Sequence, residues 1–209
     1  MKTIFQSSIF ILFSVLVSLN ANALIGEVRL TYGSTSGEPK DFNNAFYGFQ
    51  DGPKISGQSY MGVDAIAMLP MLPVGVGLRV ENTSFSKTEF NEQIDFSIAR
   101  TALLLNYRLI NTGFYLGPIV SFGLSHNMDF KIPLDPDIYK AGKQSSNTIG
   151  LEAGVKLGLF RLGLEVGQMS FVFSDLKDIS GVIPNKNGLN ISELNFGGTY
   201  YKLQLGLGF

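Results

Sequence analysis

The sequence contains no cysteine and no tryptophan, and His126 is its single histidine. Without cysteine the chain has no disulfide framework, and thiolate metal sites and redox centres are excluded. Basic side chains number 16 and acidic ones 17, so the positive field that attracts nucleic acids is also missing. We therefore expect one domain within these 209 residues, with no cofactor, no metal site and no nucleic-acid partner.

A continuous apolar run occurs only near the start of the chain. Lys2, the apolar stretch 9–19 and the small residues Ala21-Asn22-Ala23 have the layout of a secretory signal peptide that is cleaved after Ala23. No later segment approaches the roughly 20 consecutive apolar residues that a transmembrane helix needs. Residues 1–23 are therefore expected to be a signal peptide, and residues 24–209 to form the working domain.

The chain after residue 23 alternates instead with a period of two residues, which is typical of a strand whose two faces meet different surroundings. The last segment is the clearest case, because its one face carries only large apolar residues: Tyr201, Leu203, Leu205, Leu207 and Phe209. Its other face is polar or bare, with Lys202, Gln204, Gly206 and Gly208.

The same alternation recurs in seven earlier segments, near residues 24–32, 61–69, 74–81, 96–107, 114–124, 151–158 and 162–167. Eight such strands predict an all-β fold, an eight-stranded antiparallel up-and-down transmembrane barrel. Two irregularities are expected. Pro118 has no N–H for a ladder bond, which predicts a bulge or a local distortion there, and the pattern weakens after Gln168, which allows a second bulge.

The connections between the strands differ in length. Residues 70–73, 109–113 and 159–160 are predicted to be short turns, whereas long polar links lie near 34–56, 125–147 and 174–195 and a shorter one near 84–93. Three short turns and four longer loops are the arrangement of outer-membrane barrels, whose turns face the periplasm. The short turns also predict the register of two hairpins. Across the turn at 70–73, Asp64 falls opposite Arg79. Around the turn at 159–160, Gly158 pairs with Arg161, which places Lys156 beside Gly163 and Glu165.

The apolar face could in principle point inward, as in a secreted lipocalin-type barrel. Glycine argues against this, because Gly75, Gly77, Gly154, Gly163 and Gly206 all share the charged face. A narrow interior filled with long ionic side chains needs such bare positions, whereas the outer surface of a soluble barrel does not. Arg or Lys facing lipid at the midplane costs about 2–4 kcal/mol, so the charge-free face is expected to contact lipid.

The inward positions then hold the densest set of ionisable residues in the chain. Charges removed from water must be paired, so we expect a salt-bridged network that fills the lumen. An eight-stranded barrel is only wide enough for side chains, which favours a structural plug, and a narrow path for solutes or ions is the alternative. The predicted network consists of Glu27, Arg29, Asp64, Arg79, Glu81, Arg100, Glu152, Lys156, Glu165 and Lys202.

The chain resembles the small outer-membrane barrels of the OmpX and OmpA-membrane-domain type. The resemblance rests on Tyr201–Phe209, which looks like the terminal strand signal read by the barrel assembly machinery, and on 114–124, which is similar to a strand common in such barrels. It covers the whole of 24–209 in pattern but indicates no single activity. It implies Sec-type export to the outer membrane of a Gram-negative bacterium, contact with outer-membrane lipid and lipopolysaccharide, and a monomer.

An enzyme is the competing class, because some barrels of this kind hydrolyse or transfer lipid acyl chains. Ser125 and His126 are adjacent, so their side chains point to opposite faces of a strand and a Ser–His bond is not favoured. Barrel deacylases of lipid A have His and Ser two residues apart, and here that position is Met128. No catalytic residue is therefore expected. The sequence favours a non-catalytic barrel that acts through its loops in surface interaction or envelope integrity, with a channel and a lipid-modifying enzyme as alternatives.

Overall fold

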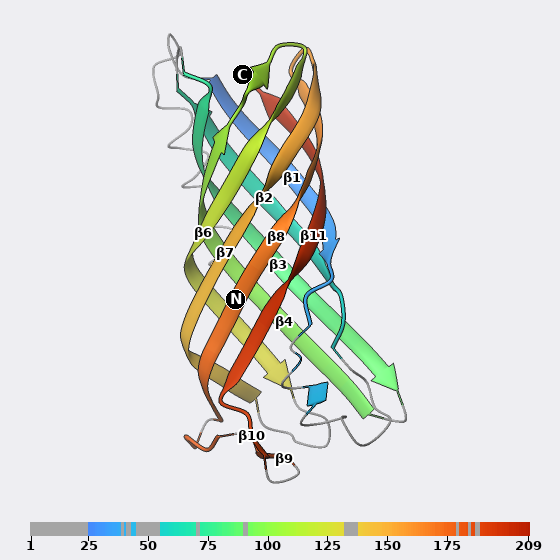
Figure 1. The fold of residues 1–209 in the computed structure, drawn as a ribbon, viewed down its shortest axis with the longest axis vertical. Helices are drawn as coiled ribbons and strands as arrows, with labels where there is room; N and C mark the ends of the chain where they lie inside the picture. Colours follow the sequence, from blue (N-terminus) through green and yellow to red (C-terminus); the bar gives the residue numbers. More distant parts are fainter. Residues whose placement is uncertain are drawn as a thin grey trace.

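A computed structural model describes residues 25–38, 40, 43–44, 55–69, 72–89, 92–131, 138–178, 180–183, 185–186 and 189–209. Eight long antiparallel strands form a closed barrel (Figure 1), because β4 pairs with β6 and β1 pairs with β11. The predicted eight-stranded up-and-down topology is confirmed. The long strands are β1 (Ile25–Thr35), β2 (Gln58–Met68), β3 (Val74–Glu89), β4 (Glu92–Tyr107), β6 (Phe114–Lys131), β7 (Ile138–Leu157), β8 (Phe160–Lys177) and β11 (Glu193–Gly208).

Short elements complete the sheet and its connections. β5 (Ile110–Asn111) extends the wall beside β6, and β9 (Asn185–Lys186) pairs with β10 (Leu189–Asn190) in a separate small hairpin. Within the described part of the chain, no helix is long and apolar enough to cross a membrane. The predicted signal peptide, residues 1–23, lies outside the described residues.

The two ends of the barrel differ, as the sequence predicted. One end, here called the turn end, holds the β2–β3, β5–β6 and β7–β8 connections, and there Gly26 and Phe209 exchange backbone hydrogen bonds of 2.8 and 2.9 Å. The other end, the loop end, holds the β1–β2, β3–β4 and β6–β7 connections and the segment between β8 and β11 (Figure 1). The predicted links near 84–93 and 125–147 were too wide, because β3 and β4 run to residues 89 and 92 and β6 and β7 run to residues 131 and 138.

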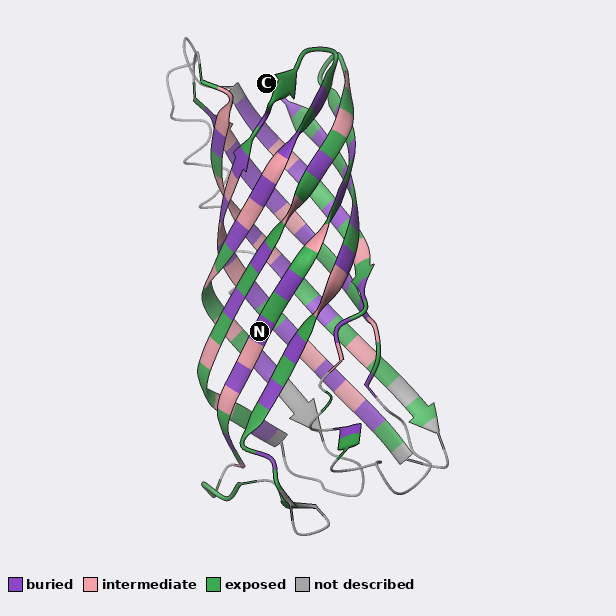
Figure 2. Cartoon of the chain, viewed as in Figure 1, coloured by how far each residue is buried: buried purple, intermediate pink, exposed green. Residues whose placement is uncertain are grey.

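The predicted inward and outward faces are confirmed along the turn-end part of the barrel. Buried and exposed residues alternate along each strand (Figure 2). In β11, Lys202 and Gln204 are 1% exposed while Leu203 and Leu205 are each 56% exposed. The register of the β2–β3 hairpin is also confirmed, since Asp64 pairs with Arg79.

The predicted register of the β7–β8 hairpin is wrong by two residues. The turn consists of Gly158 and Leu159, and Leu157 pairs with Phe160, so Lys156 lies opposite Arg161. Gly158 has a φ of +62°, the value that a two-residue hairpin turn requires at its first central position and that glycine adopts without strain. A shift of two residues preserves the faces but changes every cross-strand neighbour.

No bulge occurs at Pro118 or directly after Gln168, although the pairing of β6 changes at Pro118. The β6–β7 ladder is regular through Pro118, which lies where the neighbour of β6 on its other side changes from β4 to β5. The irregularity in β6 lies at Leu124 instead, because Thr101 pairs with Ser125 and Ala102 with Gly123. β8 keeps its register past Gln168, and its distortion comes at Asp175, which has a φ of +58°.

The outer surface of the turn-end part is an apolar belt bounded by aromatic side chains. Exposed residues of the belt include Leu30, Leu151, Leu162, Leu164, Leu203, Leu205 and Leu207. Exposed aromatics lie at its two margins: Tyr107, Phe114, Phe160 and Phe209 near the turns, and Tyr32, Phe122 and Tyr201 on the loop side. The next outward positions are polar, such as Ser34 after Tyr32 and Thr199 before Tyr201. An apolar band between aromatic girdles is the exterior that a lipid bilayer requires.

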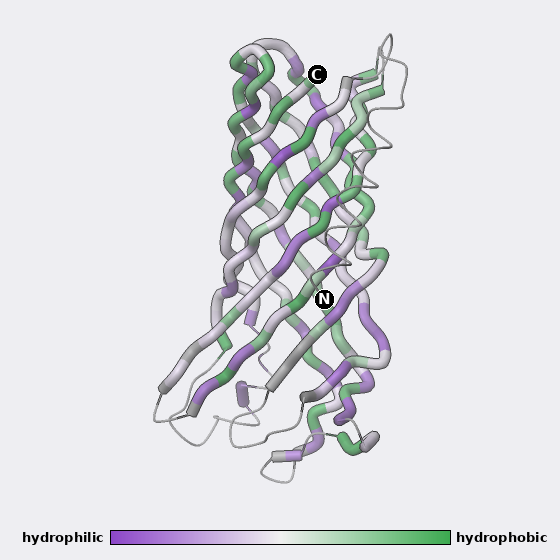
Figure 3. Tube along the Cα trace, turned by 180° about the vertical axis from the view of Figure 1, so that it is seen from behind, coloured by the Kyte–Doolittle hydropathy of each residue, from purple (hydrophilic) through white to green (hydrophobic). Residues whose placement is uncertain are grey.

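Beyond the belt the polarity of the wall inverts while the strands continue. Phe171 and Phe173 of β8, and Leu194 and Phe196 of β11, keep the inward parity of the ionic residues but are apolar and at most 1% exposed. Outward neighbours such as Asn195 are polar and exposed. Hydrophobic and hydrophilic residues thus alternate over the whole length of the strands (Figure 3). This inversion explains why the sequence pattern weakened after Gln168, since the loop-end part has the interior of a water-soluble barrel.

Candidate functional site in the barrel interior

Three groups of ion pairs lie in the turn-end part of the barrel, one after another along its axis. The first surrounds Glu27 near the turns. Arg29 and Arg108 both donate to this carboxylate, with Nη2–Oε2 distances of 2.7 Å each, and both also donate to Glu152. Asn106 adds a bond of 2.6 Å to Glu152. Both carboxylates are therefore fully engaged although they are at most 1% exposed.

The second group places Arg79 between two carboxylates. Its Nε and Nη2 atoms donate to Asp64 at 2.7 and 2.8 Å, and its Nη1 and Nη2 atoms donate to Glu165 at 2.9 and 2.7 Å. Glu165 also accepts hydrogen bonds from Tyr200 Oη and Gln204 Nε2. Such a two-sided fork uses the planar geometry that distinguishes arginine from lysine.

The third group lies nearest the loop end and centres on Glu81. Arg100 Nη1 donates to one oxygen at 2.6 Å and Lys202 Nζ donates to the other at 2.7 Å. The remaining Arg100 donors contact Ser146 Oγ at 2.6 Å and Ser121 Oγ at 2.8 Å. Each of the three guanidinium nitrogens of Arg100 therefore donates at least one hydrogen bond, which offsets the cost of retaining its charge in a closed interior.

Aromatic rings support the buried cations. The Arg108 guanidinium lies 4.4 Å from the centroid of the Tyr115 ring, and Lys202 Nζ lies 4.7 Å from that of Tyr60. The Arg100 guanidinium lies 4.9 Å from the centroid of the Phe171 ring, which is part of an apolar cluster at the loop end. Cation–π contacts of this kind gain strength when water is excluded, so the rings replace part of the lost hydration.

The apolar cluster at the loop end closes the interior above these groups. It is held together by ring contacts such as Phe96 on Phe196, whose centroids lie 4.7 Å apart. Loop residues Ile55 and Ile191 are buried in it, and Asn43 fixes the first of these by exchanging hydrogen bonds with the Ile55 backbone at 2.7 and 3.0 Å. The cluster comprises Ile55, Tyr60, Ile94, Phe96, Ile98, Met128, Tyr139, Met169, Phe171, Phe173, Leu176, Ile191, Leu194, Phe196 and Tyr200.

The structure brings together nine of the ten residues expected in the lumen: Glu27, Arg29, Asp64, Arg79, Glu81, Arg100, Glu152, Glu165 and Lys202. Lys156 departs from the expectation, because it points inward but binds Asn111 in a solvent-exposed contact. Sequence reasoning missed Arg108 and Arg161, which are 1% and 9% exposed. The inward parity of Arg100 and Asn106 continues to position 108, so the alternation carried a signal for Arg108.

His126 has a serine partner, but a different one from the neighbour considered in the sequence. Its Nε2 atom lies 2.6 Å from Oγ of Ser146, which faces it from β7. The β6–β7 ladder is interrupted here, between the pairs Phe122–Asn147 and Phe130–Tyr139. Ser146 is 2% exposed and its Oγ already accepts a bond from Arg100. The arrangement therefore joins two strands where the ladder pairs are missing.

The segment expected to act as an assembly signal lies entirely on the outside. Tyr201, Leu203, Leu205, Leu207 and Phe209 are each between 49% and 61% exposed. They continue the apolar belt along β11, beside β1 and β8. Within the described residues, no group of three or more His, Cys, Asp or Glu side chains is placed to hold a metal ion. Two of the loop aspartates, Asp135 and Asp137, lie outside the described part.

Comparisons with known proteins show the fold. No protein-family model matches the chain, and no curated protein matches it in sequence. A major outer-membrane protein from Thermus thermophilus is similar in structure, with a TM-score of 0.50, 15% identity and coverage of 90% of this chain and 99% of that one. OprG from Pseudomonas aeruginosa has a TM-score of 0.44 at 15% identity and 90% and 96% coverage. Neisserial surface protein A has a TM-score of 0.43 at 10% identity and 90% and 98% coverage.

The fold and the physical chemistry of its surfaces define the class. A closed antiparallel sheet leaves no edge strand whose backbone N–H and C=O groups would lack hydrogen-bond partners in lipid. The belt presents apolar side chains to the acyl chains. Nine of the ten charged residues expected in the lumen form ion pairs in the interior. The protein is an eight-stranded β-barrel of the bacterial outer membrane.

Proposed function

We propose that this barrel is a non-catalytic protein that acts through its loop end, in surface interaction or in envelope integrity. The filled interior carries the proposal. Arg29, Arg79, Phe171 and Phe173 are all 0% exposed, so ionic and apolar side chains occupy successive levels of the axis. A solute would have to separate several charge-assisted hydrogen bonds in a water-poor interior to pass.

The loop end suits a surface role. We place it outside the cell, because outer-membrane barrels keep their short turns in the periplasm. The β3–β4 hairpin runs beyond the belt to Glu89 and Glu92, with exposed polar residues such as Ser84 and Ser86 on its outer side. The buried residues Ile55 and Ile191 attach two of the loop segments to the apolar cluster inside this end.

The decisive experiment separates the loop end from the lumen. In one variant, residues 180–190 are replaced by a glycine–serine linker of equal length, which leaves Ile191 and β11 in place. In a second, Arg79→Met disrupts the ion pairs. Both are checked for assembly by the shift in electrophoretic mobility on boiling. We expect cells carrying the first variant to lose resistance to detergent or adherence to surfaces, while the second, once assembled, keeps both. Loss of these traits only with the lumen variant would overturn the proposal.

A narrow channel is the first alternative. It predicts discrete conductance steps in planar bilayers that increase in Arg79→Ala or Glu152→Ala, because each substitution removes a side chain that fills the lumen. We expect the wild-type protein to be silent. Regular single-channel steps in the unmodified protein would favour the channel.

A lipid-modifying enzyme is the second alternative, and the short His126–Ser146 contact is the observation in its favour. The burial of Ser146 Oγ, its bond with Arg100 and the apolar cluster above it oppose access by a substrate. We expect expression of the protein to leave the mass spectrum of lipid A and phospholipids unchanged. New acyl-loss or acyl-transfer products that disappear in both His126→Ala and Ser146→Ala would contradict the proposed function.

A further inference from the structure

Two cations face each other at the turn end, and the only carboxylate that either approaches among the described residues is Glu27, which two other arginines already bind. The two-residue turn at Gly158 places Lys156 directly opposite Arg161 on the inner face of the wall. Like charges in this position destabilise a sheet. The nearest approach of Arg161 to a carboxylate is 3.5 Å, from Nε to Glu27 Oε1, and Lys156 binds the neutral Asn111 side chain.

The carboxylates near this pair are already occupied. Glu27 and Glu152 accept from Arg29 and Arg108, so two negative charges lie among four positive ones when Lys156 and Arg161 are included. The neighbouring group of Asp64, Arg79 and Glu165 is internally bonded through Arg79. The residues around Glu27 and Glu152 therefore carry an excess of about two positive charges, next to a group that carries one net negative charge.

Arg161 is also held in place with donors to spare. Its Nη1 donates to the backbone carbonyls of Gly158 and Phe160, at 2.6 and 2.9 Å. Among the described residues, its buried Nε has no hydrogen-bond partner. A buried donor without an acceptor costs free energy, so it points to a ligand that supplies one.

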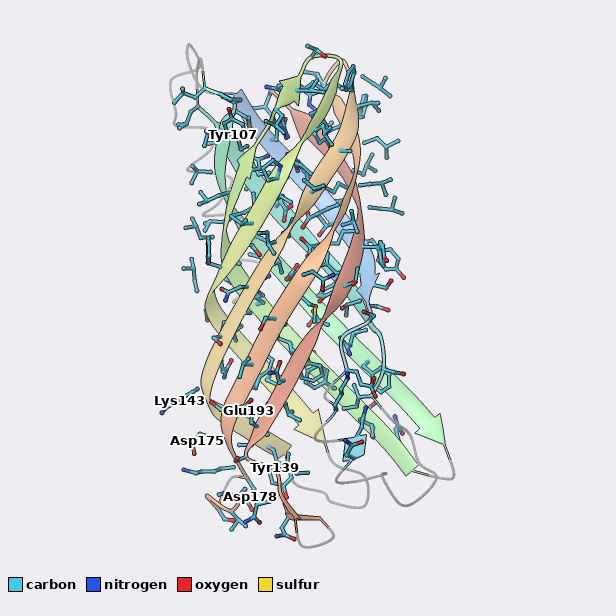
Figure 4. The ribbon with its side chains drawn as sticks, viewed as in Figure 1. Tyr107, Tyr139, Lys143, Asp175, Asp178 and Glu193 are labelled. Carbon is cyan, nitrogen blue, oxygen red and sulfur yellow. The ribbon has the colours of Figure 1, made fainter. Side chains whose placement is uncertain are left out.

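We propose that Lys156 and Arg161 form a binding site for a phosphate-type dianion at the turn end of the barrel. A fixed guanidinium beside an ammonium is the donor set that binds phosphate oxygens, and a dianion matches the local excess of charge. Bound phosphate would neutralise the facing cations and accept the free hydrogen bonds of Arg161. Tyr107 lies toward this end of the barrel, whereas Lys143 lies at the opposite end (Figure 4).

The test titrates the folded protein in phosphate-free detergent micelles with inorganic phosphate, against chloride at matched ionic strength. Calorimetry is expected to give saturable one-to-one binding for phosphate and none for chloride. Lys156→Gln and Arg161→Gln should each weaken binding by about tenfold or more, because each removes a charge-assisted hydrogen bond. Lys143→Gln, an exposed substitution at the loop end, is the matched control and should bind as the wild type does.

Two outcomes would overturn the proposal: no saturation by phosphate in the wild-type protein, or equal binding by wild type and Lys156→Gln. Lys156→Gln keeps the test valid if Arg161→Gln fails to fold, because Lys156 is only half-buried and its substitution leaves the hydrogen bonds of Arg161 intact. A further titration distinguishes the sources of the phosphate group. Nanodiscs with phosphatidic acid, whose headgroup is a phosphomonoester that can carry two charges, should compete with phosphate if the natural ligand is a lipid headgroup. Unchanged affinity relative to phosphatidylcholine discs would assign the site to a free phosphate compound.

Discussion

Arg79 offers the sharpest test of the ion-paired interior. Replacing it with methionine keeps an unbranched side chain but removes four hydrogen bonds of 2.7–2.9 Å to Asp64 and Glu165. All three residues are at most 1% exposed, so water cannot replace the lost partner. Breaking a buried ion pair from one side costs about 3–5 kcal/mol, and we expect Arg79→Met to lower the free energy of unfolding by this amount.

The two carboxylates left behind are not equivalent. Glu165 keeps hydrogen bonds from Tyr200 and Gln204, whereas Asp64 has no other side-chain partner in the described part of the chain. Neutralising Asp64 should therefore relieve more of the penalty. We expect Asp64→Asn to recover roughly 1–3 kcal/mol in the Arg79→Met background, and Glu165→Gln to recover less.

Reversible unfolding in urea, with the protein folded into phospholipid vesicles, measures these differences. The fraction folded is read from unboiled gels and from tyrosine fluorescence, which tryptophan does not obscure because the chain has none. Lys143→Met, an exposed change, should alter stability by less than about 0.5 kcal/mol. A loss below about 1 kcal/mol for Arg79→Met would refute the buried ion pairing of Arg79. Equal recovery by the two double variants would refute the difference between the two carboxylates.

Three further outcomes test other parts of the molecule. Leu205→Arg in the apolar belt should cost about 2–4 kcal/mol in the vesicle assay, and an effect no larger than that of Asn195→Arg, beyond the belt, would place the bilayer elsewhere. Phe173→Ala should cost about 3–5 kcal/mol and speed amide exchange at the loop end, so unaltered exchange there would contradict the cluster. The pKa of Asp178 should lie below its ordinary value, chiefly because the Val182 backbone N–H donates to the carboxylate. The ionised carboxylate stabilises the turn at residues 178–182 at pH values above the ordinary pKa, and this stabilisation is lost as the pH falls through the lowered pKa. NMR titration of the Asp178 carboxyl group measures the shift, and an unshifted pKa would contradict this turn.

Much of the wall could be predicted because a period of two fixes the face of every residue once the strand is recognised. The alternation in 201–209 assigned the belt and the inward Lys202 and Gln204 correctly. The same rule extended by two positions from Asn106 would have found Arg108. The assignment of apolar residues to the outside failed past Gln168, because beyond that residue the inward side chains are apolar and the outward ones are polar.

Other features depend on partners that are distant in the sequence. The bond between His126 and Ser146 joins residues 20 positions apart, and Arg29 meets Glu152 across 123 positions. In the β7–β8 hairpin, the cross-strand partner of each residue depends on which two residues form the turn. The sequence allowed Leu159 and Phe160, but the backbone uses Gly158 with its positive φ.

The sequence by itself determined the class of fold, the lipid-facing side of each strand and most of the ionic residues that enter the lumen. These properties are local, because side-chain direction in a strand follows from the backbone and an unbroken apolar face tolerates only one solvent. Only the tertiary structure decided how the charges group, why Lys156 and Arg161 face each other, and how the loop-end strands enclose a second, apolar core. Those outcomes follow from closure of the sheet, which sets the register and brings distant inner faces within contact.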